Sequence, residues 1–310
     1  MTWEHLERAR FHLRRGDGAR ALEEARRVLA TDPGDIGATE LEAAALSALG
    51  RHGDAVAAAR RLVAAAPGWE GSHIALSGVL RQADRFEEAL AAADEAIAIA
   101  PDDPVAWLER AAAAHGCGRD ADAVEAADRG LAIDPEVAEL LLVRGHALLA
   151  MNRRRAAEAT FGQLLARDPD DARAHAGLAR ADFMGMRFGR AAAGVRSALR
   201  IDPDDAGTRR LLLETARART PAGRILYPWV LWLARVPTWA RWALIIGLFG
   251  LFRVLVSDTG RSVVPMPLLV TLVVAYLAFC IVTWFGPAII DRHLRSDPER
   301  ARLLDEAGGD

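Results

Sequence analysis

The sequence predicts an all-α protein, an α-solenoid of six helix-turn-helix repeats with a capping helix, followed by two transmembrane helices. Two observations lead to this prediction. Prolines recur every 34 residues through the first two thirds of the chain, and residues 263–290 form a run of 28 residues without a charge. The first pattern is typical of stacked repeats, and the second is long enough to cross a bilayer.

The proline register spans six units without a slip. The register prolines are Pro33, Pro67, Pro101, Pro135, Pro169 and Pro203, and Pro104 is the only other proline before residue 205. A single unit of this size cannot bury its own hydrophobic face, so neighbouring units must stack to form a continuous core.

Two columns of small residues keep the same register. Twelve residues before each proline stands an alanine: Ala21, Ala55, Ala89, Ala123, Ala157 and Ala191. Twenty-four residues before each proline the residue is again small: Ala9, Ala43, Ser77, Ala111, Gly145 and Ala179. Small side chains in both columns let two helices approach closely, so each unit is predicted to contain two packed helices.

A turn separates the two predicted helices of each unit. Seventeen residues before each proline stand Gly16, Gly50, Asp84, Gly118, Asn152 and Met186. Five of these six are residue types that tolerate left-handed backbone, which ends a helix. The proline then ends the second helix, because its ring and missing N–H do not allow the helix to continue.

The pattern of helix, tight turn, helix and break resembles the tetratricopeptide repeat over residues 1–204. The resemblance implies a right-handed α-solenoid, and residues 205–220 are predicted to form a helix that caps its open end. The bulky residue that the family favours early in the first helix is present as Trp107 and Leu141. At the equivalent positions stand His5, Thr39, His73 and His175, which predict looser packing there.

Residues 238–290 are predicted to form a transmembrane hairpin with spans at about 239–257 and 264–287. Arg253 lies about one turn from the end of the first span. Its side chain is expected to reach the interface by snorkelling, although a role in an ion pathway stays open. Residues 221–237 are too short and too rich in arginine to span, and their aromatic residues favour an interfacial linker.

Arginines on both flanks of the hairpin set its predicted topology. The flank before the hairpin and the tail after it (residues 291–310) are both rich in arginine. The positive-inside rule therefore places both flanks in the cytoplasm, which requires an even number of crossings. The N-terminus has no apolar run of the kind found in a secretory signal. The repeats and the tail are thus expected on the cytoplasmic side.

The sequence contains no motif that predicts catalysis, a metal or a cofactor. It lacks HExxH, GxSxG, GxGxxG and CxxC, and its 39 basic residues are all arginines. The absence of lysine removes the phosphate-loop and Schiff-base lysines of several enzyme classes. A net charge of -3 does not favour nucleic acid as a partner. We therefore expect no enzyme, no cofactor and no nucleic-acid ligand.

The family resemblance implies that the first helices line the concave side of the solenoid. Residues that lie 30, 27, 23, 20 and 19 positions before each proline are then expected to point into this groove. The candidates are Trp3, Leu6, Arg10, Leu13, Arg14, Ile74, Arg81, Leu108, His115, Leu142, His146, Arg173, Arg180 and Phe183. Apolar pockets beside arginines suit a peptide with acidic residues. The alternative is that these arginines only keep the groove solvated.

These features predict a non-catalytic scaffold that recruits protein partners at a bilayer. The high alanine and arginine content together with the absence of lysine indicates a GC-rich, bacterial genome, so the expected location is the bacterial inner membrane. The alternative is an accessory subunit of a membrane transport, secretion or envelope-biogenesis complex, in which the hairpin makes the essential contacts. The partner, the pathway and the oligomeric state are not defined by the sequence.

Overall fold

The computed structural model describes residues 2–219 and Gly247, and the described part of the chain is all-α with no strand. Residues 2–219 form thirteen helices. They are α1 (Thr2–Arg14), α2 (Gly18–Thr31), α3 (Ile36–Ala48), α4 (His52–Ala65), α5 (Glu70–Gln82), α6 (Phe86–Ile99), α7 (Pro104–Gly116), α8 (Asp120–Ile133), α9 (Ala138–Ala150), α10 (Arg154–Arg167), α11 (Ala172–Met184), α12 (Phe188–Ile201) and α13 (Ala206–Arg219).

The predictions for the linker at 221–237, the hairpin at 238–290 and the tail at 291–310 lie outside the described residues, apart from the helical Gly247. Within the described residues, none of the helices combines the length and the apolar character that a membrane crossing needs.

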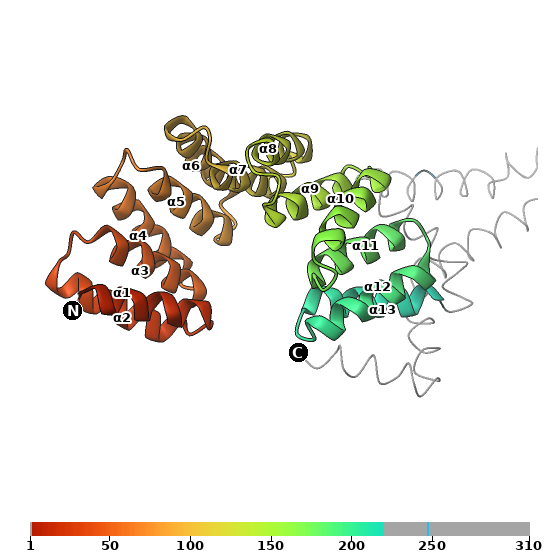
Figure 1. Ribbon diagram of the computed structural model, residues 1–310, viewed down its shortest axis with the longest axis horizontal. Coiled ribbons are helices and arrows are strands. Elements are labelled where there is room, and N and C mark those ends of the chain that lie inside the picture. The colour runs from red at the N-terminus through yellow and green to blue at the C-terminus, as the bar shows by residue number, and fades with distance from the viewer. Residues whose placement is uncertain (1, 220–246, 248–310) are drawn as a thin grey trace, which may run out of the picture. The chain divides into compact units, whose positions relative to one another are not determined.

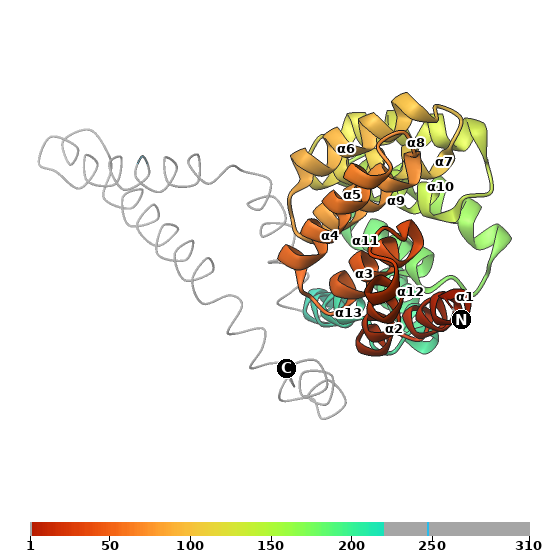
Figure 2. The same ribbon diagram turned by 90° about the vertical axis from the view of Figure 1, so that its left-hand side faces the viewer.

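The chain divides into two compact units, Met1–Pro169 and Asp170–Asp310. Unit 1 holds the helix pairs of repeats 1–5, from α1/α2 to α9/α10. The described part of unit 2 holds the pair of repeat 6, α11/α12, and the capping helix α13. In unit 1 the helix pairs follow one another in chain order, as Figures 1 and 2 show. The prediction of stacked helical hairpins is confirmed.

The second helix of each repeat ends where the proline register predicts. The residue directly before each proline is the C-cap of an even-numbered helix: Asp32, Ala66, Ala100, Asp134, Asp168 and Asp202. Aspartates begin several of the helices, because their carboxylates accept hydrogen bonds from first-turn N–H groups that lack a helical partner. Asp35, for example, accepts a bond of 2.7 Å from the N–H of Ala38.

The turn inside each repeat has left-handed backbone at the predicted residue. Gly16, Gly50 and Gly118 have φ between 71° and 75°. The equivalent residues Asp84, Asn152 and Met186 have φ between 57° and 59°. Methionine is an unfavourable residue for this conformation, so at Met186 the repeat geometry overrides the local preference of the side chain.

Both columns of small residues lie in the core. The alanines twelve residues before each proline are 0% exposed, and the four alanines and Ser77 of the other column are 0% or 1% exposed. Gly145, the remaining member of that column, faces the fully buried ring of Phe161. A Cβ at Gly145 would lie 2.5 Å from this ring. The larger Phe161 in repeat 5 is therefore accommodated by the smaller residue opposite it.

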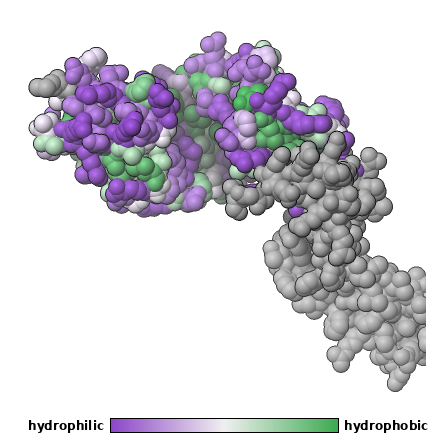
Figure 3. Space-filling view, turned by 90° about the horizontal axis from the view of Figure 1, so that it is seen from below, coloured by the Kyte–Doolittle hydropathy of each residue, from purple (hydrophilic) through white to green (hydrophobic). Residues whose placement is uncertain are grey.

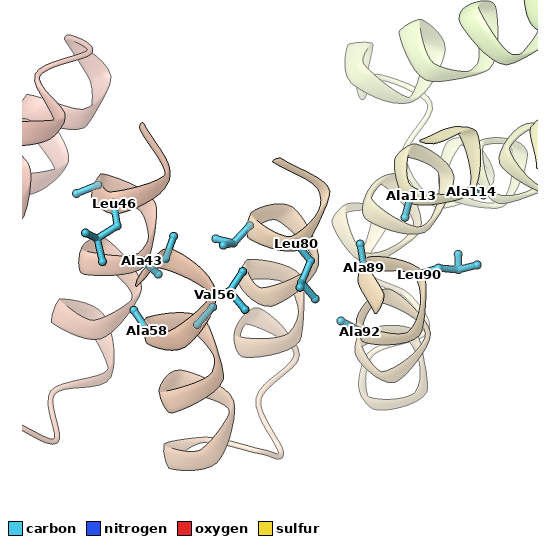
Figure 4. Packing of buried hydrophobic residues seen from close by; sticks show 14 of the residues in the cluster. Ala43, Leu46, Val56, Ala58, Leu80, Ala89, Leu90, Ala92, Ala113 and Ala114 are labelled. Carbon is cyan, nitrogen blue, oxygen red and sulfur yellow. The ribbon is translucent and has the colours of Figure 1, made fainter. Parts of the chain in front are cut away.

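A continuous apolar core runs through unit 1. Its largest cluster joins buried residues of successive helix pairs, including Leu46 of α3, Val56 of α4, Leu80 of α5 and Leu90 of α6 (Figure 4). Each helix pair thus covers the apolar side of the next pair, which a single pair cannot do for itself.

The residue six positions after the register proline, early in the first helix, contacts the carbonyl group of that proline in two repeats. Trp107 donates from Nε1 to the carbonyl of Pro101 at 2.8 Å. His73, one repeat earlier, places Nε2 at 3.1 Å from the carbonyl of Pro67. The imidazole is long enough to reach the equivalent carbonyl, so His73 keeps the contact that Trp107 makes. Looser packing at the histidine positions stays a prediction.

Helix α13 occupies the position of the predicted capping helix and packs on α11 and α12. The Asp205 carboxylate accepts a bond of 2.9 Å from the N–H of Gly207 and a second bond from the Thr208 hydroxyl. Leu211 and Ala218 of α13 join Phe183 and Val195 in the core of unit 2. The cap therefore covers apolar surface that repeat 6 would otherwise expose.

Candidate protein-binding surface

The odd-numbered helices form the inner layer of unit 1. Each successive odd pair is in contact: α1 with α3, α3 with α5, α5 with α7, and α7 with α9. Successive even-numbered helices of the unit make no comparable contact. In a curved stack the helices on the inner side lie closer together than those on the outer side. The odd helices therefore line the concave side of this unit, as the family resemblance implies.

Three of the predicted groove residues of repeat 1 are exposed. Trp3 is 69% exposed, and Arg10 and Arg14 are exposed on the same helix, α1. Leu6 and Leu13 are half-buried against the small apolar cluster of repeats 1 and 2. The guanidinium of Arg10 donates to the Glu7 carboxylate of α1 at 2.9 Å. An indole and guanidinium groups thus share one helix face.

The inner layer also contains an acidic residue, Glu40, which is not among the candidates predicted from the sequence. Glu40 of α3 lies 27 residues before Pro67, the same offset that selected Leu6 and Ile74. Burial raises the pKa of Glu40 above its ordinary value, and the nearby Arg10 partly offsets this effect. The repeat register was the signal that could have identified Glu40.

In repeats 3 and 4 the predicted groove residues Arg81 and His115 already have carboxylate partners. Arg81 pairs with Glu109 of the next repeat at 3.4 Å, and the Glu109 side chain is only 12% exposed. His115 Nδ1 lies 2.6 Å from the carboxylate of Asp120. Ile74 and Leu108 are half-buried beside them. Arg81 and His115 therefore hold adjacent helices together in this structure.

Between these charged groups, the inner layer is lined by small residues. At the same groove offsets stand Ala44, Ala48, Gly78, Ala112 and Gly116, all of them at least partly exposed. Small side chains leave room above the backbone for another polypeptide. On the face of the molecule in Figure 3, hydrophobic residues form patches within a largely hydrophilic surface.

Two predicted groove residues lie in the core. Leu142 of α9 is 7% exposed and Phe183 of α11 is 6% exposed. The Phe183 ring packs edge-to-face on Phe188 at a centroid distance of 5.5 Å, and the His146 ring meets Phe161 in the same way. Packing of one aromatic ring against another takes Phe183 away from the surface that its spacing predicts.

The remaining predicted residues, Arg173 and Arg180 of α11, are exposed in unit 2. Arg173 lies 3.6 Å from the Asp171 carboxylate. An open pocket of about 400 Å³ also lies in this unit. The residues that line it are Met186, Arg187, Phe188, Gly189, Arg190 and Arg219. The repeat pattern does not predict this pocket, because its residues come from the turn before α12, the start of α12 and the end of α13.

Across residues 2–219 and Gly247, no three or more histidine, cysteine, aspartate or glutamate side chains come together where they could hold a metal ion.

Comparison with known proteins extends the fold assignment to a family. The family model described as "Tetratricopeptide repeat" matches residues 6–69, 74–138 and 142–206. Comparison with curated protein sequences gives no significant match.

Solved structures with a similar fold come from diverse systems. The Cut9–Hcn1 hetero-tetramer of the APC/C matches with a TM-score of 0.61 at 18% identity, over 69% of this chain and 43% of that one. A tetratricopeptide repeat protein from Parabacteroides merdae matches with a TM-score of 0.60 at 16% identity, over 69% and 84%. PilF of Pseudomonas aeruginosa matches with a TM-score of 0.54 at 17% identity, over 69% and 97%. These identities establish the shared fold alone.

Proposed function

Because this chain belongs to the tetratricopeptide repeat family, we propose that it is a non-catalytic adaptor that binds a protein partner through the inner layer of its repeats. Proteins of this fold serve in general as scaffolds for protein interactions. The proposal adds to this general role a surface, a class of ligand and a membrane location.

The observation that carries the proposal is the inner face of α1. Trp3 is 69% exposed there, although an indole is usually at least half-buried when it serves only the fold. Arg14 has no carboxylate within ion-pair distance among residues 2–219. Tryptophan and arginine are the residue types that most often dominate binding energy at interfaces. Both side chains are thus available to a partner.

The proposed ligand is an extended or helical peptide that carries acidic residues. Arg14 can bind a carboxylate with two parallel hydrogen bonds, and Trp3 offers apolar area beside it. The exposed alanines of α3 leave space for the peptide to continue over repeat 2. Arg81 is not part of this proposal, because Glu109 holds it.

The proposed location is the inner membrane of a bacterium, with the repeats and the tail in the cytoplasm. The support for it is the uncharged run at 263–290 and the arginine-rich flanks of residues 238–290. Confinement to the bilayer raises the local concentration of a bound partner without any catalysis. Fractionation of cell membranes, followed by an alkaline wash, tests this location independently of peptide binding.

A photo-crosslinking amino acid tests the binding surface within one repeat. It replaces Ala44 of α3 in one variant of the full chain and Ala57 of α4 in the other. Both alanines are exposed and both belong to repeat 2, but they lie on the inner and the outer layer. After irradiation in native membranes, partners are identified by mass spectrometry.

The expected result is a partner that crosslinks from position 44 and not from position 57. Its yield should fall at least tenfold when Trp3→Ala and Arg14→Gln are combined, since loss of an interface anchor typically costs about 2 kcal/mol or more. Equal yields from both positions, or a yield that is indifferent to Trp3 and Arg14, would refute binding through the inner layer.

A further inference from the structure

Helix α12 of unit 2 carries positive charge without compensating negative charge of its own. Its sequence contains Arg190, Arg196 and Arg200 and no aspartate or glutamate. All three arginines are exposed, as is Ala193. At 100° per residue, the three arginines lie within about 60° of Ala193 around the helix axis. They therefore form one basic face, defined here as Arg190, Arg196 and Arg200.

Little of this charge is neutralised by the described residues. Arg190 lies 3.5 Å from the Asp182 carboxylate and keeps 71% of its side chain exposed. Arg196 donates to the carbonyl of Ala192 in its own helix at 3.1 Å. Among residues 2–219, no carboxylate lies within ion-pair distance of Arg196 or Arg200. The basic face thus has free capacity for an anionic partner.

The pocket of unit 2 lies at the start of the same helix. Arg187, Arg190 and Arg219 line it together with Phe188 and Met186, and Met186 is 54% exposed. Asp182 is the carboxylate that pairs with both Arg187 and Arg190. The pocket therefore offers guanidinium groups beside apolar side chains. A ligand with a phosphate group and a hydrocarbon part complements both.

The proposed anchor limits how far this surface can lie from a bilayer. Helix α13 ends at Arg219, and the predicted first span begins at about residue 239. Even fully extended, the intervening chain reaches only about 70 Å. The inner leaflet of a membrane carries anionic lipids that attract basic segments next to a span.

From these observations we infer that the basic face of α12 and the adjoining pocket dock on anionic phospholipid headgroups of the bilayer that holds the anchor. The inference rests on the proposed membrane location and adds a second contact with the bilayer. Such docking fixes the orientation of repeat 6 at the membrane surface.

The expected strength follows from the number of arginines. Each arginine near an anionic surface favours binding by about fivefold, so removal of three should shift the docking equilibrium on the order of a hundredfold. Because the attraction is electrostatic, about 1 M salt should release the face, since the screening length then falls to about 3 Å.

A spin label on the basic face measures docking in the full chain. The label is attached to Ala193→Cys, with Cys117→Ser and Cys280→Ser making it unique. The protein is reconstituted into vesicles of phosphatidylcholine with or without phosphatidylglycerol. Contact of the label with a water-soluble nickel chelate should fall severalfold only in the anionic vesicles, and high salt should reverse the change.

Two triple variants separate the basic face from total charge. Arg190→Gln, Arg196→Gln and Arg200→Gln together should abolish the effect of phosphatidylglycerol. Arg20→Gln, Arg27→Gln and Arg60→Gln change the net charge by the same amount in unit 1 and should leave it intact.

Equal contact in the two lipid compositions, or a response that survives the α12 triple variant, overturns the docking inference alone if the protein floats with vesicles after an alkaline wash. A full chain that does not float overturns the membrane anchor and the docking inference together.

Discussion

The second helices of repeats 3 and 4 carry an aspartate at a position where the second helix of repeat 6 carries an arginine. Seven residues before the proline, Asp94 and Asp128 each pair with an arginine of the next repeat, at 2.8 Å and 2.7 Å. Arg196 stands at the equivalent position of α12, and among residues 2–219 its one hydrogen-bond acceptor is the carbonyl of Ala192 in the same helix.

This difference shows that the buried small residues of the repeat, called its frame here, are kept between repeats while the surface charge is not. Helix α6 has four carboxylates and no basic residue, whereas α12 has three arginines and no carboxylate. Both helices nevertheless keep a fully buried alanine twelve residues before the proline. The frame tolerates either sign of charge on its outer side, because only the inward-facing residues are constrained by packing.

The largest effect is expected where repeats 5 and 6 differ in the core. Phe161 and Val195 are equivalent and both are 0% exposed. Phe161→Ala should lower the free energy of unfolding by about 3–5 kcal/mol, whereas Val195→Ala should cost only about 2 kcal/mol. Urea unfolding followed by circular dichroism measures both.

Gly145→Ala serves as the control for this difference, because the sign of its effect should depend on Phe161. In the natural background the added methyl group meets the Phe161 ring and should cost about 1–3 kcal/mol. In the Phe161→Ala background the same methyl group occupies vacated space and should stabilise. A cost of equal size in both backgrounds would contradict the compensation between the two residues.

The turns should respond in opposite directions in repeats 4 and 6. Gly118 has φ 74° with open space around its Cα, so Gly118→Ala adds backbone strain without a clash and should cost about 1–2 kcal/mol. Met186 bears such strain already, and Met186→Gly should stabilise by about 1 kcal/mol. Thermal unfolding of both variants tests this, and a destabilised Met186→Gly would show that the methionine side chain matters more than its backbone.

The two units should also differ in their response to pH. Hydrogen bonds from the Thr208 hydroxyl and from backbone N–H groups lower the pKa of Asp205. Asp205 therefore stabilises unit 2 above its ordinary pKa, and this contribution is lost as the pH falls through the lowered value. Asp205→Ala should cost about 1 kcal/mol at pH 7, and less in acid.

Glu40 of unit 1 should behave in the opposite way. Burial raises the pKa of Glu40. Its contribution to stability is therefore fully present at a pH below the ordinary pKa, and it is lost as the pH rises through the raised pKa. Glu40→Gln should stabilise the protein at pH 7 and have little effect at pH 4. The gain at pH 7 should be smaller than the loss that Asp205→Ala causes. Unfolding curves at both pH values test the pair, and parallel shifts would contradict the assignment.

The smallest effect is expected for the ion pair between Asp94 and Arg110. Asp94→Asn should cost roughly 0.5 kcal/mol, as is usual for an exposed pair. Arg196→Gln at the equivalent position should cost nothing measurable, because no carboxylate among the described residues holds it. A double-mutant cycle on Asp94 and Arg110 isolates the pair energy, which should be close to zero above 1 M salt.

The fold was predictable because a fixed period carries information that single residues lack. Met186 is a poor turn residue, yet its place in the register predicted the turn, and its φ of 57° confirms the prediction. The proline register likewise located the end of every second helix. The tertiary compensation of Phe161 by Gly145 was not predictable, because the spacing along the sequence does not show which side chain of the second helix faces Gly145.

The candidate surface was less predictable, since helical spacing gives the direction of a side chain but not its neighbours. Phe183 has a groove offset, yet it is buried against Phe188. Arg81 has the same kind of offset, yet Glu109 of the following repeat holds it. Glu40 has the same offset as Leu6 and Ile74, but the spacing alone does not show that its carboxyl group is partly buried. Partners from adjacent repeats become visible only when the helices are placed in three dimensions.

The polarity of one inter-repeat pair bears on how the array assembles in the right order. Arg26 of repeat 1 meets Glu42 of repeat 2, whereas repeats 3 and 4 offer Asp94 and Asp128 to arginines. A chain that skipped repeats 2 and 3 would bring Arg26 against Arg110, two like charges. Repeats of such similar shape are prone to domain swapping and to docking on the wrong neighbouring repeat. The reversed polarity of the ion pair at the first junction therefore disfavours the docking of repeat 1 on repeat 4.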